Sequence, residues 1–420
     1  MGKFNHKMIV ISAVIVLLVG ACTVEPADQA ARVTTGVTVE QEQQLPVHGL
    51  QTREELRRER MPGADEPVPA TQAKNRMDYS AAMPVAGMAQ LRAPAEPVNR
   101  EIYAHFSDNP LHRVADDPFS TFSIDVDTGA YSNMRRMLNA GNRPLKDAIR
   151  TEELINYFSY DYPPPKRRST PFSVTVEAGP SPWNPDTRLL HIGIQGYDVP
   201  RAQLPAANLV FLVDVSGSMQ SPDKLGLLKS ALRLLVRELE ADDRVSLVVY
   251  AGASGVVLEP TPGDQSATIS AALDGLTAGG STNGGAGIRL AYALAQQAFI
   301  EDGINRVILA TDGDFNVGTV DFEMLKQLVE ERRGHGIGLT TLGFGTGNYN
   351  DHLMEQLADA GNGNYAYIDT LSEARKALVD EMSSTLLTIA KDVKIQDEFN
   401  PATVAEYRQI GYENRALARE

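Results

Sequence analysis

Short apolar runs alternate with longer amphipathic segments between residues 206 and 390. The runs have the length of buried strands, and in the longer segments apolar residues recur every three or four positions, as in helices that cover a sheet. The clearest such segment extends from Leu225 to Leu239 and follows Ser221-Pro222-Asp223, a typical helix start. We therefore predict an α/β fold with a doubly wound, mostly parallel sheet. The expected strands are 209–213, 245–250, 306–310, 339–344 and 365–368.

The residues just before this region alternate between apolar and polar positions, which is typical of half-buried strands. Segments 172–178 and 189–194 predict an antiparallel hairpin, and the loop between them holds Trp183, the single tryptophan of the chain. We assign residues 167–205 to a small flanking β-rich domain. Trp183 is expected to pack in the core or at the rim.

Residues 100–166 form a separate block that ends just after three consecutive prolines. Its pattern predicts a strand at 119–128 and helices at 131–138 and 151–158. The strand contains Asp125-Val126-Asp127, a triplet that a haloacid-dehalogenase-like phosphatase would use as nucleophile and acid. Gly129 stands where that motif needs threonine or valine, so we favour a strand-to-helix turn over catalysis.

The first residues have the three-part form of a secretory signal. Lys3 and Lys7 precede an apolar stretch, residues 8–19, which is too short to span a bilayer permanently and is followed by small residues before Cys22. This ending resembles a bacterial lipobox, which implies cleavage after residue 21 and a lipid on the Cys22 thiol. Cys22 is the only cysteine, so an intramolecular disulfide is excluded. The alternative is a secretory leader followed by an incidental cysteine.

Residues 22–99 have a different composition, in which polar and small residues dominate, prolines are frequent and aromatic residues are almost absent. Such a segment lacks the apolar side chains of a core, so we predict a disordered tether. With a lipid on Cys22, it would hold the folded part at the bacterial cell envelope and leave it free to reach partners. Thr23, in place of aspartate, favours the outer membrane where the host has two membranes.

Three polar segments of the α/β region can supply oxygen ligands to a cation. Asp214-Val215-Ser216-Gly217-Ser218 and Thr311-Asp312-Gly313 each end an apolar run, and the glycine-rich residues 279–285 between them contain Thr282. Carboxylates and hydroxyls, without sulfur or imidazole, suit Mg²⁺, Ca²⁺ or Mn²⁺. The carboxyl ends of strands are also where ligands dock in open α/β sheets. We therefore predict a divalent-cation site at that edge of the sheet.

In this order the three segments resemble the metal-ion-dependent adhesion site of von Willebrand factor type A domains, and the resemblance covers residues 208–390. It implies a Rossmann-like fold and a divalent cation, Mg²⁺ before Ca²⁺ or Mn²⁺. It also implies that Ser216 and Ser218 ligate the ion directly. Asp214 and Asp312 would act through water or as hydrogen-bond acceptors, and Thr282 would ligate or approach according to the state of the domain. The position left open would take a carboxylate from a protein partner.

The flanking residues resemble those of a group of bacterial lipoproteins that carry this type of domain. Residues 100–166 are similar to the region before the domain, and residues 391–420 to the start of the C-terminal region after it. This implies a truncated C-terminal region and an exposed sheet edge. The predicted division is 1–21 signal peptide, 22–99 lipidated cysteine and linker, 100–166 N-terminal associated region, 167–205 flanking β segment, 206–390 A domain and 391–420 C-terminal associated region.

Charge and motif spacing exclude several other functions. The net charge of −15 argues against nucleic acid or an anionic lipid surface as a ligand. No lysine follows the glycine-rich loop at the spacing that phosphate binding needs, and Gly343-Phe344-Gly345-Thr346-Gly347 lacks the last glycine of a dinucleotide fingerprint. We therefore expect neither nucleic acid nor nucleotide as a partner.

We predict a non-catalytic, envelope-anchored protein that recognises an acidic side chain of a protein partner through a divalent cation. A first alternative is a structural or assembly factor of an envelope complex, in which the cation only stabilises the fold. A metal-dependent hydrolase is a weaker alternative, because the sequence offers no general base or activated nucleophile beside the site.

Overall fold

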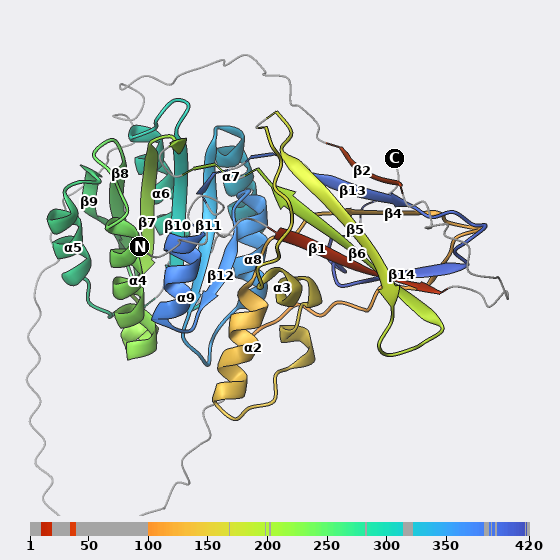
Figure 1. Ribbon diagram of the computed structural model, residues 1–420. Helices are drawn as coiled ribbons and strands as arrows, with labels where there is room; N and C mark the ends of the chain where they lie inside the picture. The colour runs from red at the N-terminus through yellow and green to blue at the C-terminus, as the bar shows by residue number, and fades with distance from the viewer. Residues whose placement is uncertain are drawn as a thin grey trace, which may run out of the picture. The chain divides into compact units, whose positions relative to one another are not determined.

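A six-stranded sheet forms the centre of the α/β part in the computed structural model of this chain (Figure 1). The structure describes residues 10–18, 34–38, 100–167, 169–197, 199–200, 203–281, 284–313, 322–381, 386–387, 389–390, 393–415 and 417. The strands are β7 (Ala207–Asp214), β8 (Arg244–Tyr250), β9 (Ser254–Pro262), β10 (Ile304–Thr311), β11 (Ile337–Phe344) and β12 (Tyr365–Ile368). They lie in the order β12-β11-β10-β7-β8-β9, and all are parallel except β9, which runs antiparallel to β8. The predicted doubly wound, mostly parallel sheet is confirmed, and β9 is a strand that the sequence pattern did not predict.

Side chains alternate between the two faces of this sheet, and each face has its own apolar core. On β7, Leu209, Phe211 and Val213 belong to one buried cluster, whereas Val210 and Leu212 belong to the other. β7 and β10 are buried along their whole length. Burial on both faces explains why these strands have continuous apolar sequences rather than an alternating pattern.

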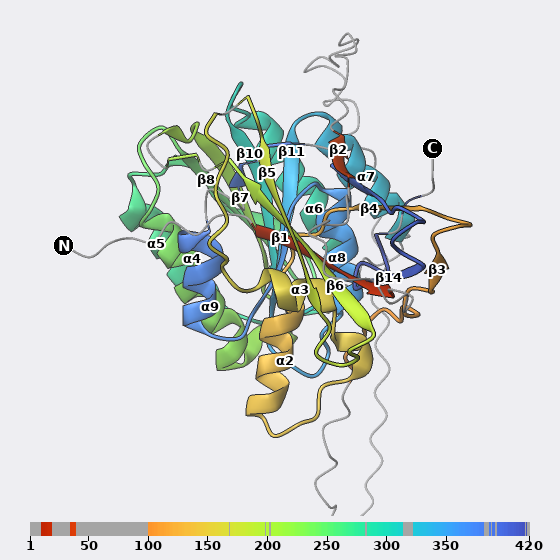
Figure 2. The same ribbon diagram turned by 45° about the vertical axis from the view of Figure 1, so that its right-hand side comes forward.

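Helices cover both faces of the sheet (Figure 2). The core that contains Phe211 is completed by α4 (Leu227–Val236), α5 (Ser266–Asp274) and α9 (Leu371–Arg375). The opposite core is completed by α6 (Gly284–Gln297), α7 (Phe322–Gly334) and α8 (Asp351–Ala360). Short helical turns precede α4 and follow α9, namely η3 (Gly217–Gln220), η4 (Pro222–Gly226) and η5 (Lys376–Asp380).

Two smaller antiparallel sheets flank the α/β part, with the strand orders β3-β14-β1-β6-β5 and β2-β13-β4. Their strands are β1 (Val10–Leu18), β2 (Thr34–Thr38), β3 (His112–Arg113), β4 (Phe119–Ser123), β5 (Phe172–Pro180), β6 (Thr187–Gly196), β13 (Lys394–Glu398) and β14 (Glu406–Ile410). The pairing of β5 with β6 confirms the predicted hairpin. Phe122 of β4, Ile192 of β6 and Tyr407 of β14 belong to one buried cluster. Three segments that are distant in the sequence therefore share a single β core.

Trp183 lies in the loop between β5 and β6 and is 73% exposed. Its expected packing in the core or at the rim is therefore wrong. The last paired residues of the hairpin are Pro180 and Arg188, so the loop extends beyond the ladder.

The apolar stretch predicted as an export leader contains β1. This strand pairs antiparallel with β6 over its whole length and with β14 through residues 14–18. The placement belongs to the uncleaved chain, because cleavage after residue 21 would remove β1 and leave β6 and β14 without the strand between them. Cys22 and most of the predicted tether lie outside the described residues. Within the described residues, no helix combines the length and the apolar character needed to cross a membrane.

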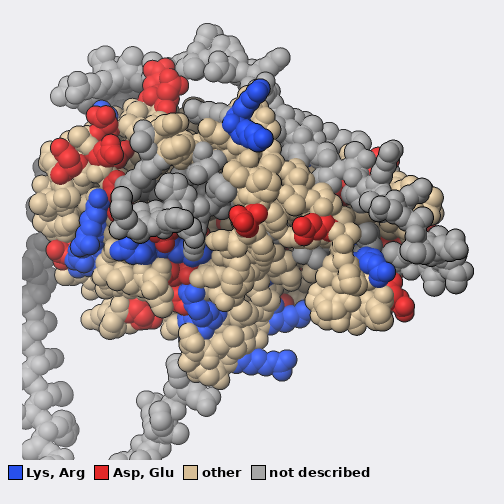
Figure 3. Space-filling view, in the orientation of Figure 1, with Lys and Arg blue, Asp and Glu red and all other residues tan. Residues whose placement is uncertain are grey.

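Residues 100–166 contain the helices α2 (Gly129–Asn139) and α3 (Thr151–Asn156), with the short turn η1 (Lys146–Ala148) between them. The helices α2 and α3 confirm the two predicted helices. Ion pairs anchor this block to the α/β part. Arg135 on α2 pairs with Asp369 at 2.5 Å, and Arg150 before α3 pairs with Asp351 of α8 at 2.6 Å. On the face in Figure 3, the acidic and basic side chains of the described residues are interspersed rather than gathered by sign.

Candidate metal centre

The predicted polar segments meet at the carboxyl edge of the central sheet. Asp214 is the last residue of β7, and Asp312 follows β10, the neighbouring parallel strand. The glycine-rich loop docks on the first segment, where Gly217 N donates to Gly280 O at 3.0 Å. Thr282 lies outside the described residues, so its role at the ion stays a prediction.

Asp214 organises the first motif by hydrogen bonding. Its Oδ1 accepts from the backbone N–H of Ser216 at 2.8 Å, and its Oδ2 accepts from the hydroxyls of Thr311 at 2.9 Å and Tyr250 at 3.3 Å. The hydroxyl oxygens of Ser216 and Ser218 lie 3.0 Å apart. The two hydroxyls are therefore close enough to contact one ion.

Burial makes the Asp214 carboxylate costly to ionise in the absence of a cation. The side chain is fully buried, and this loss of solvation, together with the charge of Asp312, raises the pKa of Asp214 to about 6. Hydrogen bonds from Ser216 and Thr311 oppose the rise without cancelling it. A divalent cation beside the carboxylate would favour its ionised form and so reverse this effect.

Asp312 is also fully buried, and a lysine that belongs to none of the three predicted segments lies against it. Lys224 Nζ donates to Asp312 Oδ2 at 2.9 Å, and Asn348 Nδ2 donates to the same oxygen at 3.3 Å. Lys224 and Asp312 are 88 residues apart in the chain. No spacing rule connects a residue at a helix start with one after a distant strand, so the sequence held no signal for this contact.

Gly313 completes the Thr-Asp-Gly motif for a steric reason. Its φ is +85°, a conformation that side chains other than glycine rarely adopt. A Cβ at this position would lie 2.3 Å from the backbone nitrogen of Asn350. The motif therefore needs glycine where the chain turns away from Asp312.

The donors at this edge fit a hard divalent cation. Within the described part of the chain, no three side chains of His, Cys, Asp or Glu come together as a metal site. The centre instead combines the carboxylates of Asp214 and Asp312 with the hydroxyls of Ser216 and Ser218. Oxygen donors of this kind are those that Mg²⁺ and Ca²⁺ take.

Asp125 and Asp127 belong to a structural network rather than to this centre. Asp125 Oδ2 accepts from Arg415 at 3.1 Å, and Asp127 Oδ1 accepts from the backbone N–H of Tyr365 at 2.8 Å. The strand β4 ends at Ser123, earlier than predicted. The two carboxylates thus tie the turn before α2 to the C-terminal residues and to β12, as the expected strand-to-helix turn requires.

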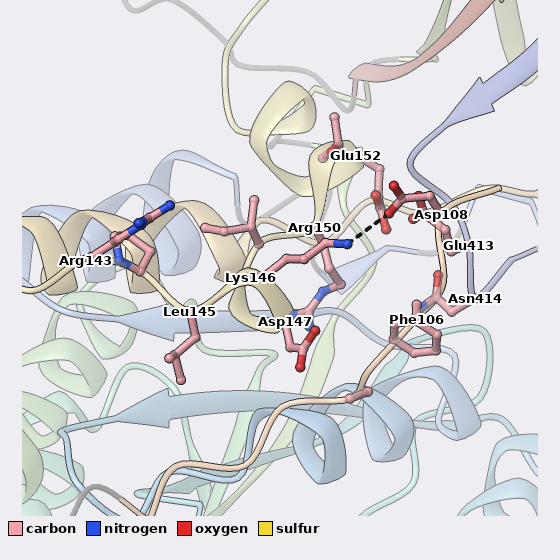
Figure 4. A pocket seen from close by; sticks show the side chains of 14 residues that line it. Phe106, Asp108, Arg143, Leu145, Lys146, Asp147, Arg150, Glu152, Glu413 and Asn414 are labelled. Carbon is pink, nitrogen blue, oxygen red and sulfur yellow. Dashed lines mark hydrogen bonds and ion pairs between the residues drawn. The ribbon is translucent and has the colours of Figure 1, made fainter.

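A cavity of about 740 Å³ lies beside η1 and α3 (Figure 4). None of the residues that line it belongs to the metal centre. It is lined by residues of η1 and α3 and by Glu413 and Asn414, and Lys146 pairs with Asp108 there at 3.3 Å. Glu152, which also lines it, is 1% exposed. Burial, with a contribution from the charge of Asp125, raises the pKa of Glu152 to about 8.

Glu152→Gln is expected to make stability less dependent on pH. The pKa of Glu152 is about 8 in the folded chain against an ordinary value of 4.5, so its stabilising contribution is complete below pH 4.5 and is lost as the pH rises through 8. Above pH 8 the neutral glutamine should raise the free energy of unfolding by on the order of 2 kcal/mol. Urea denaturation at pH 5 and above pH 8 measures the difference. Glu177→Gln, at an exposed position of β5, is the control, and equal effects of Glu152→Gln at both pH values would contradict the account.

Three segments of the chain match known families. Residues 97–191 match the family described as von Willebrand factor, residues 209–314 the von Willebrand factor type A domain, and residues 384–420 the C-terminal region of the uncharacterized protein YfbK. The chain contains a von Willebrand factor type A domain. The matched residues of this A domain include Asp214, Ser216, Ser218 and Asp312.

Two curated relatives are themselves uncharacterized. YfbK of Escherichia coli K12 is 52% identical over 324 residues, which cover 76% of this chain and 56% of YfbK. The protein sll0103 of Synechocystis sp. PCC 6803 is 32% identical over 186 residues, 44% of this chain and 43% of the relative. The chain thus spans about half the length of the curated relatives it matches. Its order of N-terminal region, A domain and C-terminal region is YfbK-like.

Solved structures also align with part of the chain. The conserved hypothetical protein BatB from Bacteroides thetaiotaomicron is 21% identical, and the alignment covers 43% of this chain and 98% of BatB with a TM-score of 0.37. A von Willebrand factor type A protein from Catenulispora acidiphila is 19% identical over 46% of this chain and 44% of its own, with a TM-score of 0.38.

Proposed function

We propose that the A domain binds a protein partner through a divalent cation, with Mg²⁺ as the first choice of ion. The observation that carries this proposal is the meeting of two hydroxyls and two buried carboxylates at the carboxyl edge of β7 and β10. Ser216 and Ser218 would ligate the ion. Asp214 and Asp312 would support it through water or hydrogen bonds, and Thr282 would complete the set.

The cation would supply an electrophile for an acidic side chain of the partner. Hydroxyl ligands bring no charge, and the negative charge of Asp312 is already shared with Lys224. The ion would therefore keep much of its positive charge and attract a further anionic ligand. Such a centre favours recognition over turnover, in line with A domains, which are typically non-catalytic.

The neighbouring residues give the site a rigid base. Asp214 is held by Ser216, Thr311 and Tyr250, and each bond comes from a strand or from the turn directly after one. A carboxylate held on several sides costs little further ordering when the ion binds. The geometry thus supports a site in which the supporting carboxylate of Asp214 is already held in place before the partner arrives.

Partner capture tests the proposal. Because the leader predicted before Cys22 would direct the chain to the cell envelope, detergent-solubilised envelopes are the source of candidate partners. The chain should retain a partner in Mg²⁺ and release it both in EDTA and when Ser216→Ala/Ser218→Ala replaces the parent, because each change removes the bridging ion. Affinity capture followed by mass spectrometry measures the bound proteins.

Ser230→Ala is the matched control, because the hydroxyl of Ser230 donates to Gly226 O on the first turn of α4 at 3.0 Å and lies outside the predicted ligand set. It should bind as the parent does. Circular dichroism must show that all variants fold. If the partners that the parent retains in Mg²⁺ are also retained in EDTA and by the double variant, cation-bridged recognition is refuted, and a cation that only stabilises the fold is favoured.

A further inference from the structure

Lys224 is a buried lysine whose ammonium group lies inside the candidate metal centre. Lys224 is 6% exposed, and its Nζ donates to Asp312 Oδ2 at 2.9 Å and to Asn348 Oδ1 at 3.1 Å. Lys224 comes from η4, Asp312 directly follows β10, and Asn348 lies in the segment between β11 and α8. Burying an ammonium costs solvation, so a position of this kind needs the compensation that Asp312 provides.

The segment after β11 is shaped to admit this side chain. Gly345 has a φ of +72°, and a Cβ on it would lie 2.2 Å from Lys224 Cε and 2.3 Å from Cγ. Any other residue at position 345 would therefore displace the lysine stem or the segment itself. Gly345, in the glycine-rich segment 343–347 that lacks the last glycine of a dinucleotide fingerprint, thus has a role in seating Lys224.

The charges at this edge do not balance as they would in a site built for tight cation binding. Asp214 and Asp312 are both fully buried and close enough for the charge of one to act on the other. Lys224 places one positive charge beside these carboxylates, and its ammonium group donates a hydrogen bond to one oxygen of Asp312. A divalent ion entering the centre would meet both the attraction of two carboxylates and the repulsion of the ammonium.

We propose that Lys224 is a permanent cation of the metal centre, which holds Asp312 in place and keeps the affinity for the divalent ion low. This inference rests on the proposed function. A loosely held ion with few charged ligands stays attractive to a carboxylate, so the partner's acidic side chain contributes a large share of the total binding of the ion. Lys224 thereby couples occupancy of the centre to the presence of the partner.

The competing account is an ordinary buried ion pair that stabilises the fold and does not affect the ion. Both accounts predict that removing the ammonium lowers stability without metal, since Asp312 would lose its counter-ion. They differ in the affinity for the ion. If Lys224 is only a structural pair, removing its charge should leave the affinity for the ion unchanged or lower it. If Lys224 is a permanent cation of the centre, removing its charge should raise that affinity.

The test compares Mg²⁺ binding by the full chain with that of Lys224→Met, using isothermal titration calorimetry. Methionine matches the length of the lysine stem and removes its charge. We expect Lys224→Met to bind Mg²⁺ about tenfold more tightly or better, because one repelling unit charge is gone from a buried site. Its unfolding temperature should fall in EDTA and should rise more than that of the parent when Mg²⁺ is added.

Two further variants keep the test decisive. Lys146→Met makes the same change of net charge at a lysine whose side chain is 75% exposed, and it should leave Mg²⁺ binding unchanged. Lys224→Gln is also uncharged but retains a hydrogen-bond donor, and it answers the same question where Lys224→Met does not fold. If the parent binds Mg²⁺ and the Lys224 variant that folds binds it equally or more weakly, the inference is overturned. If the parent itself binds no Mg²⁺, Mn²⁺ or Ca²⁺, the proposed function fails instead.

Discussion

Arg150→Met is expected to lower the free energy of unfolding by about 3–5 kcal/mol. The Arg150 guanidinium lies between the carboxylates of Glu153 and Asp351, with Nη1 2.6 Å from Asp351 Oδ2, and the residue is 5% exposed. Removing it would leave buried carboxylates without their cation, which costs more than the loss of a hydrogen bond alone. Urea denaturation followed by circular dichroism measures the loss at pH 8.

The same variant should cost less at pH 5. Burial raises the pKa of Glu153 to about 7 and that of Glu355, which lies 3.5 Å from Arg150, to about 8. Both groups can therefore take up a proton below these values and remain neutral in the absence of the arginine. Arg113→Met is the control, because its side chain is 72% exposed and its contact with Asp116 is 4.0 Å long, so less than about 0.5 kcal/mol is expected. A loss for Arg150→Met that matches this control, or that does not vary with pH, would show that the network carries little stability.

The strands of the central sheet could be predicted because a strand that is buried on both faces has a continuous apolar sequence. β7 and β10 have no exposed residue along their length, so each is a continuous apolar run bounded by polar residues. β9 has several exposed positions and two prolines, and its pairing with β8 contains register shifts. At an edge of the sheet it needs only one partner, so its sequence carries neither a continuous nor a regularly alternating pattern.

Partners across long stretches of chain could not be predicted. β4 pairs with β13, although some 270 residues separate Phe122 from Ile395 in the register. Period-two alternation shows which side chains share a face, but it does not select the strand on the other side. The contact between Lys224 and Asp312 could not be predicted either, because a charged side chain in the first turn of a helix is usually exposed to solvent. The candidate centre was predictable only to the extent that its donors follow strands directly, as Asp214 and Asp312 do.

Asp214→Asn is expected to weaken Mg²⁺ binding by at least about 100-fold, because it removes one of two carboxylate charges beside a divalent ion. In EDTA at pH 8, however, the variant should unfold no more easily than the parent. Asp214 has a pKa of about 6 in the folded chain, so at pH 8 its buried carboxylate is ionised, which lowers the stability of the fold. Asparagine has nearly the same shape and carries no charge. Calorimetry measures the affinity, and urea denaturation in EDTA measures the stability.

The two readouts separate electrostatics from packing. At pH 5 the parent carboxyl is largely protonated in the absence of metal, so the stability difference between Asp214→Asn and the parent should shrink there. Asp116→Asn, at a side chain that is 75% exposed, should change neither quantity. Retained Mg²⁺ affinity in Asp214→Asn would remove this residue from the metal centre. If Asp214→Asn unfolds more easily than the parent at pH 8, the hydrogen bonds from Ser216, Thr311 and Tyr250 require the negative charge of the carboxylate. Asp214 would then hold the first motif together even when no ion is bound.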